Sequence, residues 1–180
     1  MAVSMKTTSV PRWSTSTSEV ESVLADPDVA LVLLVADCEV DDELVEALCR
    51  GSVASTRVVR AAGSVSSDPE LAAALTEAKV GWRFVAIGPE VSVGRIVSQL
   101  MREGAIATEI SVLATEQPDI TAQRERDVFC AHCHAVSVTD STVDGVVVCS
   151  GCNADLTVYY HYSRRHGAYL GFRADSEDIE

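Results

Sequence analysis

Four cysteines near the C-terminus constrain the fold of this chain more than any other feature. They form two Cys-x-x-Cys pairs, Cys130 with Cys133 and Cys149 with Cys152, separated by the 15 residues 134–148. Each pair is typical of a knuckle, a tight turn that points two thiolates at one metal ion, and this spacing is typical of zinc sites. Because four thiolates complete a tetrahedron and leave no position for water, we expect one structural zinc ion per chain.

The residues around the pairs fit a small zinc ribbon over residues 128–173. The position after each knuckle often needs a left-handed backbone, which Asn153 tolerates well and His134 tolerably. The intervening VTDSTVDGVVV predicts a hairpin with an Asp-Gly turn, which would bring the knuckles together. A ribbon this small lacks a core of its own, and structural zinc supplies roughly 10–16 kcal/mol of apparent binding free energy.

Other assignments of these residues stay open. Rubredoxin-type iron also takes four thiolates and would make the chain an electron carrier. Rubredoxin-like knuckles usually continue with Gly, where this chain has His134 and Asn153, and the gap between the pairs is short for that fold. His132 and His134 are alternative ligands that we interpret as exposed knuckle residues. Cys38 and Cys49 lie in apolar-rich segments far from the pairs, and we interpret them as buried thiols.

The charge balance excludes several partners. The 180 residues include 27 Asp and Glu against 14 Lys and Arg, a formal net charge of −13. A surface this acidic repels phosphate backbones and anionic lipid heads, so we expect neither nucleic acid nor membrane binding. The chain has no run of 18 apolar residues, and its polar first 19 residues lack the apolar region of a secretory signal. We predict a flexible tail over residues 1–19 and a cytoplasmic protein.

Residues 20–118 predict an α/β domain, because continuous apolar runs alternate with segments of helical period. Strands are expected at 29–35, 56–61, 82–87 and 109–113, and helices at 41–50, from a cap at Ser67 or Asp68, and at 90–103. Such alternation with short links gives a doubly wound parallel sheet. We expect a charged linker at 119–127 between this domain and the zinc ribbon, and an acidic tail at 174–180.

Tyrosine, histidine and arginine gather after the second knuckle, in a chain that is only 5% aromatic. The cluster is the largest basic patch in an acidic protein, so it is a candidate contact for a partner carboxylate or an anionic ligand. The candidate contact residues are Tyr162, Arg164, Arg165 and Tyr169. In the alternative interpretation, the tyrosines fill the ribbon core and the arginines pair with Asp155 or Asp175.

The same segment carries a family resemblance. Cys149-Ser-Gly-Cys152, followed by His161-Tyr-Ser-Arg-Arg-His-Gly-Ala-Tyr-Leu-Gly171, resembles the C-terminal signature of the small subunit of bacterial dimethylamine monooxygenase. The resemblance covers residues 128–172, although family knuckles often carry Gly after the second cysteine and this chain does not. It implies a non-catalytic, zinc-binding subunit of a heteromeric complex that oxidises dimethylamine to methylamine and formaldehyde with NADPH and O₂. Haem, flavin and iron–sulfur groups would then lie on catalytic and reductase partner subunits, and any activity of the isolated chain stays open.

The N-terminal domain carries a second resemblance. Val85-Ala-Ile-Gly88-Pro89-Glu90 is similar to the last strand and helix of ferredoxin-reductase-type NAD domains, where the motif is Cys-Gly-Pro and Ile87 stands here for the cysteine. The first strand of such domains leads into a Gly-rich turn that binds pyrophosphate. Here residues 36–43 have no glycine and five carboxylates, which would repel a nucleotide. We expect a reductase-like fold without an intact nucleotide site.

Overall fold

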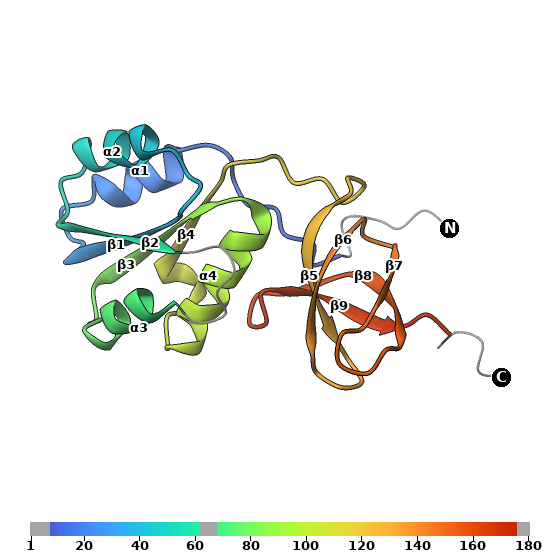
Figure 1. Cartoon of the computed structure of the whole chain (residues 1–180). Coiled ribbons are helices and arrows are strands. Elements are labelled where there is room, and N and C mark those ends of the chain that lie inside the picture. Colours follow the sequence, from blue (N-terminus) through green and yellow to red (C-terminus); the bar gives the residue numbers. More distant parts are fainter. Residues whose placement is uncertain (1–7, 62–67, 176–180) are drawn as a thin grey trace. The chain divides into compact units, whose positions relative to one another are not determined.

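The computed structural model of the chain describes residues 8–61 and 68–175 (Figure 1). These residues divide into two compact units. The α/β unit runs from Trp13 to Gln117, and the C-terminal unit joins residues 118–175 to residues 8–12. The helices of the described residues are all too short or too polar to cross a bilayer.

A parallel sheet forms the centre of the α/β unit. Its strands are β1 (Leu31–Asp37), β2 (Thr56–Ala61), β3 (Trp82–Gly88) and β4 (Ile110–Ala114), in the order β2-β1-β3-β4. Residues 32–36 of the central strand β1 have no exposed surface, as expected for a strand that is covered on both faces. The prediction of a parallel α/β fold is therefore confirmed, with strand limits within two residues of those expected.

Helices cover both faces of this sheet. They are α1 (Ser18–Leu24), α2 (Asp42–Arg50), α3 (Pro69–Thr76) and α4 (Glu90–Arg102), followed by the short 3₁₀ helix η2 (Ala107–Glu109). In Figure 1, α1 and α2 lie on one face and α3 and α4 on the other. Asp68 caps α3 by accepting from the N–H groups of Glu70 and Leu71. The alternative cap, Ser67, lies outside the described residues.

The N-terminal segment differs from the expected flexible tail over residues 8–19. Val10 and Trp13 are buried, and the Tyr162 N–H donates to Ser9 Oγ at 2.9 Å. Helix α1 begins at Ser18 and buries Val20 and Leu24 in the core of the α/β unit. This packing could not be predicted from a Ser/Thr-rich segment with few apolar residues, because the segment packs against distant parts of the chain.

The C-terminal unit is a mixed sheet of five strands. They are β5 (Arg124–Cys130), β6 (Val136–Ser141), β7 (Val146–Val148), β8 (Asp155–Ser163) and β9 (Ala168–Arg173), in the order β6-β5-β9-β8-β7. Only β5 and β9 pair in parallel. The strands expected to form a hairpin, β6 and β7, do not pair with each other, since β6 adds to β5 and β7 adds to β8. The expected turn does form, with Asp144 in the left-handed region at φ 74°.

Residues 124–127 are part of β5 and not of a linker as expected. Arg126 is 1% exposed, and its guanidinium donates to the backbone carbonyls of Asp119, Ala122 and Ser141. The Arg126 guanidinium carbon also lies 5.7 Å from the centre of the Tyr169 ring. The charged residues of this segment indicate a linker, but they form a strand. The strand can bury its arginine because segments before and after β5 provide hydrogen-bond acceptors for the guanidinium. Of the predicted acidic tail, residues 176–180 lie outside the described residues.

Candidate metal centre

The two Cys-x-x-Cys turns have the same backbone geometry. In the first knuckle, the His134 N–H donates to the Cys130 carbonyl at 2.9 Å, and the Cys130 N–H donates to the Ala135 carbonyl at 2.9 Å. In the second knuckle, Asn153 and Ala154 make the equivalent bonds with Cys149 at 3.0 and 2.9 Å. His134 and Asn153 have φ values of 66° and 56°, so the left-handed positions predicted after each knuckle are confirmed.

The knuckles bring all four sulfurs together. The Sγ atoms of Cys130, Cys133, Cys149 and Cys152 all lie within 4.8 Å of one another. Cys130 and Cys152 are 3.9 Å apart and Cys133 and Cys149 are 3.5 Å apart, far beyond a disulfide bond of about 2.05 Å. A tetrahedron with Zn–S bonds of about 2.3 Å has edges of about 3.8 Å. The donor set and its spacing therefore fit one four-coordinate ion.

Small side chains allow the second knuckle to approach the first. A Cβ atom on Gly151 would lie 2.7 Å from the Ala135 Cβ and 3.0 Å from the Cys133 Sγ, so any larger residue at position 151 would push the knuckles apart. The Ser137 hydroxyl on β6 accepts from the Ser150 N–H at 2.9 Å and also contacts the Ser150 hydroxyl at 3.1 Å. These contacts tie the free edge of β6 to the second knuckle. The roles of Gly151 and Ser137 were not predicted from the sequence, although a glycine inside a knuckle indicates that another segment approaches closely there.

Backbone N–H groups and neighbouring thiols shift the pKa values of Cys149 and Cys133 in opposite directions. The N–H groups of Cys152 and Gly151 lower the pKa of Cys149 to about 6, and the Gly151 N–H lies 3.4 Å from that sulfur. At Cys133 the N–H of Ala135 lowers the pKa, but desolvation and the three neighbouring thiols outweigh it, and the pKa of Cys133 rises to about 12. Four adjacent thiols do not ionise together by themselves, and a cation among them removes that obstacle.

The histidines of the first knuckle do not join the sulfurs. In the described part of the chain, the group of ligand atoms close enough to share one ion consists of the four cysteines alone. His134 instead stacks on Phe129 at 5.6 Å between ring centres, and His166 stacks on the same ring at 4.1 Å. Cys38 and Cys49 belong to the α/β unit and are not part of this group. Cys38 is exposed and Cys49 is half-buried, where we expected two buried thiols.

The structure separates the four residues predicted to contact a partner. Tyr162 and Tyr169 are 9% and 2% exposed and pack edge to face with ring centres 5.1 Å apart. Arg164 and Arg165 are exposed in the turn between β8 and β9. The tyrosines therefore fill the core of the C-terminal unit, as in the alternative interpretation, and only the two arginines remain candidates for contact. The ion pair to Asp175 comes from Arg173.

Carboxylates accept hydrogen bonds from the N-termini of α2 and α4 in the α/β unit. At the start of α2, the Asp41 side chain accepts from the Glu43 N–H at 2.9 Å. At the start of α4, the Glu116 side chain accepts from the Glu90 N–H at 3.2 Å. In dinucleotide-binding domains, N–H groups of a helix N-terminus at this edge of the parallel sheet bind the pyrophosphate. Here the chain's own carboxylates occupy them.

We therefore expect the full chain to bind neither NADPH nor NADH. A pyrophosphate would have to displace Asp41 and Glu116 and then approach the other carboxylates of residues 36–43. Calorimetric titration should give only heats of dilution. Saturable binding in the micromolar range would contradict this interpretation of the carboxyl edge of the sheet.

Comparisons with known proteins bear on the C-terminal unit first. Residues 127–172 match the family described as "Dimethylamine monooxygenase subunit DmmA-like, C-terminal domain". The C-terminal unit is DmmA-like. The predicted resemblance to the small subunit of dimethylamine monooxygenase is therefore confirmed.

A curated relative matches a longer part of the chain. The "Heme-dependent oxidative N-demethylase delta subunit" of Ectopseudomonas mendocina (strain ymp) is 35% identical over 107 residues. The alignment covers 59% of this chain and 57% of the relative. One solved structure also matches, a 2-deoxy-scyllo-inosose synthase complexed with carbaglucose-6-phosphate, NAD⁺ and Co²⁺. The match covers 52% of this chain and 28% of the synthase chain. Its identity of 15% and TM-score of 0.38 are too low to support any argument.

Proposed function

We propose that this chain is a non-catalytic, metal-binding subunit of a heteromeric oxidative N-demethylase. The DmmA-like C-terminal unit carries the proposal, together with a relative that is named as the delta subunit of such an enzyme. The finer proposal is a cytoplasmic complex that demethylates dimethylamine to methylamine and formaldehyde with NADPH and O₂. Haem, flavin and iron–sulfur groups then belong to catalytic and reductase partner subunits.

Zinc is the metal that we propose for the four sulfurs. A closed set of four thiolates suits a structural ion, because it leaves no position open for water or substrate. Its role here is to hold the two knuckles together. The alternative is a rubredoxin-like iron centre that transfers electrons. Colour and redox activity separate the two, since zinc is colourless and has no redox chemistry.

The proposal is tested by purifying the chain from its native host and identifying the proteins that elute with it. We expect haem- and flavin-containing subunits at a fixed ratio, and amine-dependent NADPH oxidation by the complex. A chain that elutes alone from a host that actively demethylates dimethylamine would contradict the proposal.

Arg164 and Arg165 provide a sharper test of the partner surface. Changing both to alanine should leave the melting temperature nearly unchanged, because both side chains are exposed, while co-purification with the partner subunits and amine-dependent NADPH oxidation both fall. Arginine is enriched among the interface residues whose loss costs about 2 kcal/mol or more, which is roughly a thirtyfold loss in affinity. Arg173→Ala is the matched control, because Arg173 is exposed in the same unit and pairs with Asp175. Normal assembly and turnover of the double variant would show that the turn between β8 and β9 is not part of the interface.

A further inference from the structure

Negative charge is concentrated in one segment of the α/β unit. Residues 18–50, which carry α1, β1 and α2, contain ten Asp and Glu residues and a single basic residue, Arg50. Their formal charge of −9 is most of the −13 of the whole chain. Nine of the ten carboxylates are exposed, all but that of Asp37, and Arg50 is paired with Glu46 at 3.6 Å. The helical layer on this face of the sheet is therefore strongly anionic.

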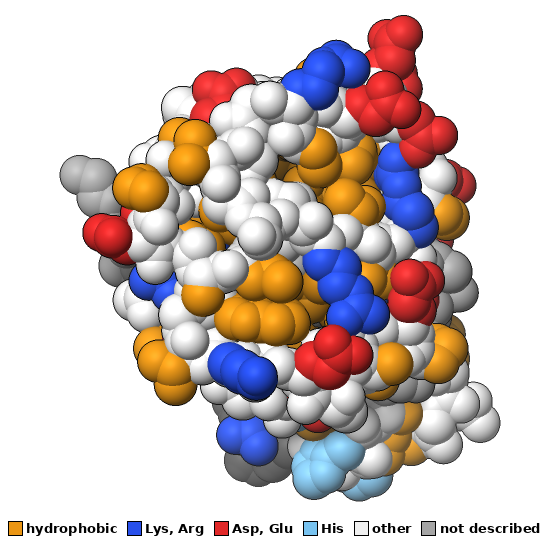
Figure 2. Space-filling model, turned by 90° about the vertical axis from the view of Figure 1, so that its left-hand side faces the viewer, with side chains coloured by type: hydrophobic (Ala, Val, Ile, Leu, Met, Phe, Trp, Pro, Cys, Tyr) orange, Lys and Arg blue, Asp and Glu red, His pale blue; other side chains and the backbone are white. Residues whose placement is uncertain are grey.

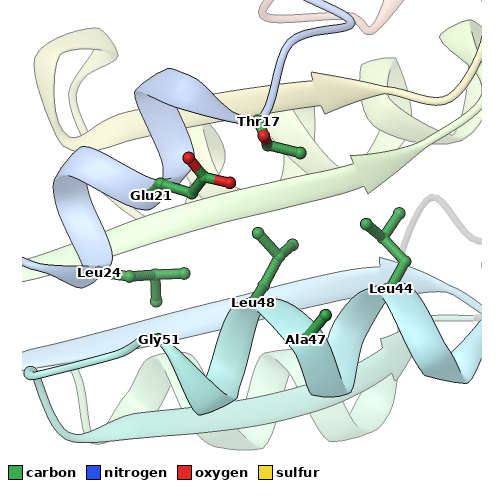
Figure 3. A pocket seen from close by; sticks show the side chains of 7 residues that line it. All are labelled: Thr17, Glu21, Leu24, Leu44, Ala47, Leu48 and Gly51. Carbon is green, nitrogen blue, oxygen red and sulfur yellow. The ribbon is translucent and has the colours of Figure 1, made fainter.

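An apolar groove runs through this layer. It has a volume of about 230 Å³ between α1 and α2, and Figure 3 shows Leu24 of α1 facing Leu44 and Leu48 of α2 across it, with Glu21 at its rim. Pockets for whole small molecules usually measure about 300–1,000 Å³. A groove of this size suits the apolar side chains of a larger partner better than a complete cofactor.

We propose that this groove binds an amphipathic, Lys/Arg-rich helix of a companion subunit. Two neighbouring helices present a groove in which a third helix can pack. Leu44 and Ala47 of α2 would contact its apolar stripe, above a floor formed by the buried Leu24 and Leu48. The surrounding carboxylates would pair with its basic flanks, which gives fast and specific association. An anionic ligand and a second copy of this chain are both disfavoured, because each would meet like charge.

Exposed hydrophobic and acidic side chains also occur together on one face of the molecule (Figure 2). Figure 2 shows a face on which hydrophobic side chains are exposed in hollows, with Asp and Glu side chains gathered mainly at its upper right. The inference rests on the proposed function for the existence of companion subunits. The chemistry of the groove comes from residues 17–51 alone.

A synthetic probe tests the groove without the companion subunits. The probe is an amphipathic peptide helix of Leu and Lys, compared with the same helix in which Glu replaces every Lys. We expect the Leu/Lys helix to bind the full chain saturably and the Leu/Glu helix not to bind. Glu21→Lys should weaken binding of the Leu/Lys helix at least about tenfold, because it reverses a charge at the groove.

Glu103→Lys is the matched control for this peptide experiment. It makes the same change of charge at the exposed end of α4, on the opposite face of the sheet. Because exposed charges more than about 10 Å apart are screened at 0.1 M salt, Glu103→Lys should weaken binding less than about twofold. Equal losses in both variants would mean attraction by bulk charge alone, and no loss in either would place the peptide elsewhere. Both outcomes would overturn the proposal.

The assembled complex then tests the occupant. Ala47 is exposed at the groove. Ala47→Arg adds bulk and a positive charge that repels a basic helix. Arginine has a high helix propensity, so α2 should stay helical. Ala47→Gln adds bulk without charge. We expect the arginine variant to associate with the companion subunits at least about tenfold more weakly than the glutamine variant. Carbodiimide should also join carboxylates of α1 or α2 to lysines of one companion helix.

The outcomes for the groove and for the proposed function are distinguishable. If the unaltered chain associates with its companions and Ala47→Arg associates equally well, the groove proposal is wrong while the proposed function stands. If the unaltered chain associates with no demethylase subunit, the proposed function is wrong. In that case the comparison of Glu21→Lys with Glu103→Lys still decides whether the groove binds basic helices.

Discussion

Changing Cys149 to serine is expected to release the metal and unfold the C-terminal unit. Four thiolates hold the ion, and the sulfur of Cys149 is buried and receives backbone N–H groups of its own knuckle. Structural zinc supplies roughly 10–16 kcal/mol of apparent binding free energy. This is similar to the whole stability of a typical domain, about 5–15 kcal/mol, so the unit should not stay folded without the ion. The α/β unit has a separate core and should stay folded.

The aromatic residues report on the two units separately. Both tryptophans, Trp13 and Trp82, belong to the α/β unit, and all four tyrosines lie between residues 159 and 169 of the C-terminal unit. Near-ultraviolet circular dichroism should therefore lose its tyrosine signal in Cys149→Ser, while tryptophan emission should not change. Cys38→Ser, at an exposed cysteine outside the sulfur cluster, should alter neither signal. A Cys149→Ser chain that keeps its metal and its tyrosine signal would refute the four-thiolate assignment.

Arg126→Met should destabilise the C-terminal unit by about 3 kcal/mol or more. Each hydrogen bond from a charged donor contributes about 1.5–3 kcal/mol, and the change leaves buried carbonyl groups without a donor. The carbonyls concerned are those of Asp119, Ala122 and Ser141. Methionine fills a similar volume, so the loss would come mainly from the hydrogen bonds. Urea unfolding followed by the tyrosine signal measures it.

The control for Arg126→Met is Arg173→Met. Arg173 lies on β9 of the same sheet, but its side chain is 55% exposed and its partner Asp175 is 61% exposed. Exposed ion pairs contribute little to stability, so the midpoint of unfolding should hardly move. Equal shifts in the two variants would show that the buried guanidinium has no special structural role.

Apart from α1 and η2, the order of strands and helices in the α/β unit could be predicted because each of these elements carries its own local pattern. The apolar run of β1, the cap at Asp68 and the Gly88-Pro89 start of α4 all act on neighbouring residues. The cysteine spacing likewise predicted a cluster that the structure forms. These features depend on short-range geometry, which the sequence displays directly.

The elements that could not be predicted depend on distant contacts. Arg126 looks like part of a charged linker until the carbonyls of Asp119 and Ser141 are seen beside it. Tyr162 and Tyr169 looked like interface residues because an aromatic cluster has the same composition in a core and on a surface. Strand pairing in the C-terminal unit could not be predicted either. An Asp-Gly turn indicates a reversal of the chain, but it does not show that β6 pairs with β5 and β7 with β8.

Metal analysis of the purified full-length chain tests the central claim most directly. Plasma emission spectrometry, combined with native mass spectrometry, should find close to one zinc ion per chain, little iron, and a colourless protein. The ion should leave together with the tyrosine circular dichroism signal when a strong chelator is added, because binding free energy at such a site is folding free energy. A red protein that contains stoichiometric iron, or a folded C-terminal unit without any metal, would contradict the account.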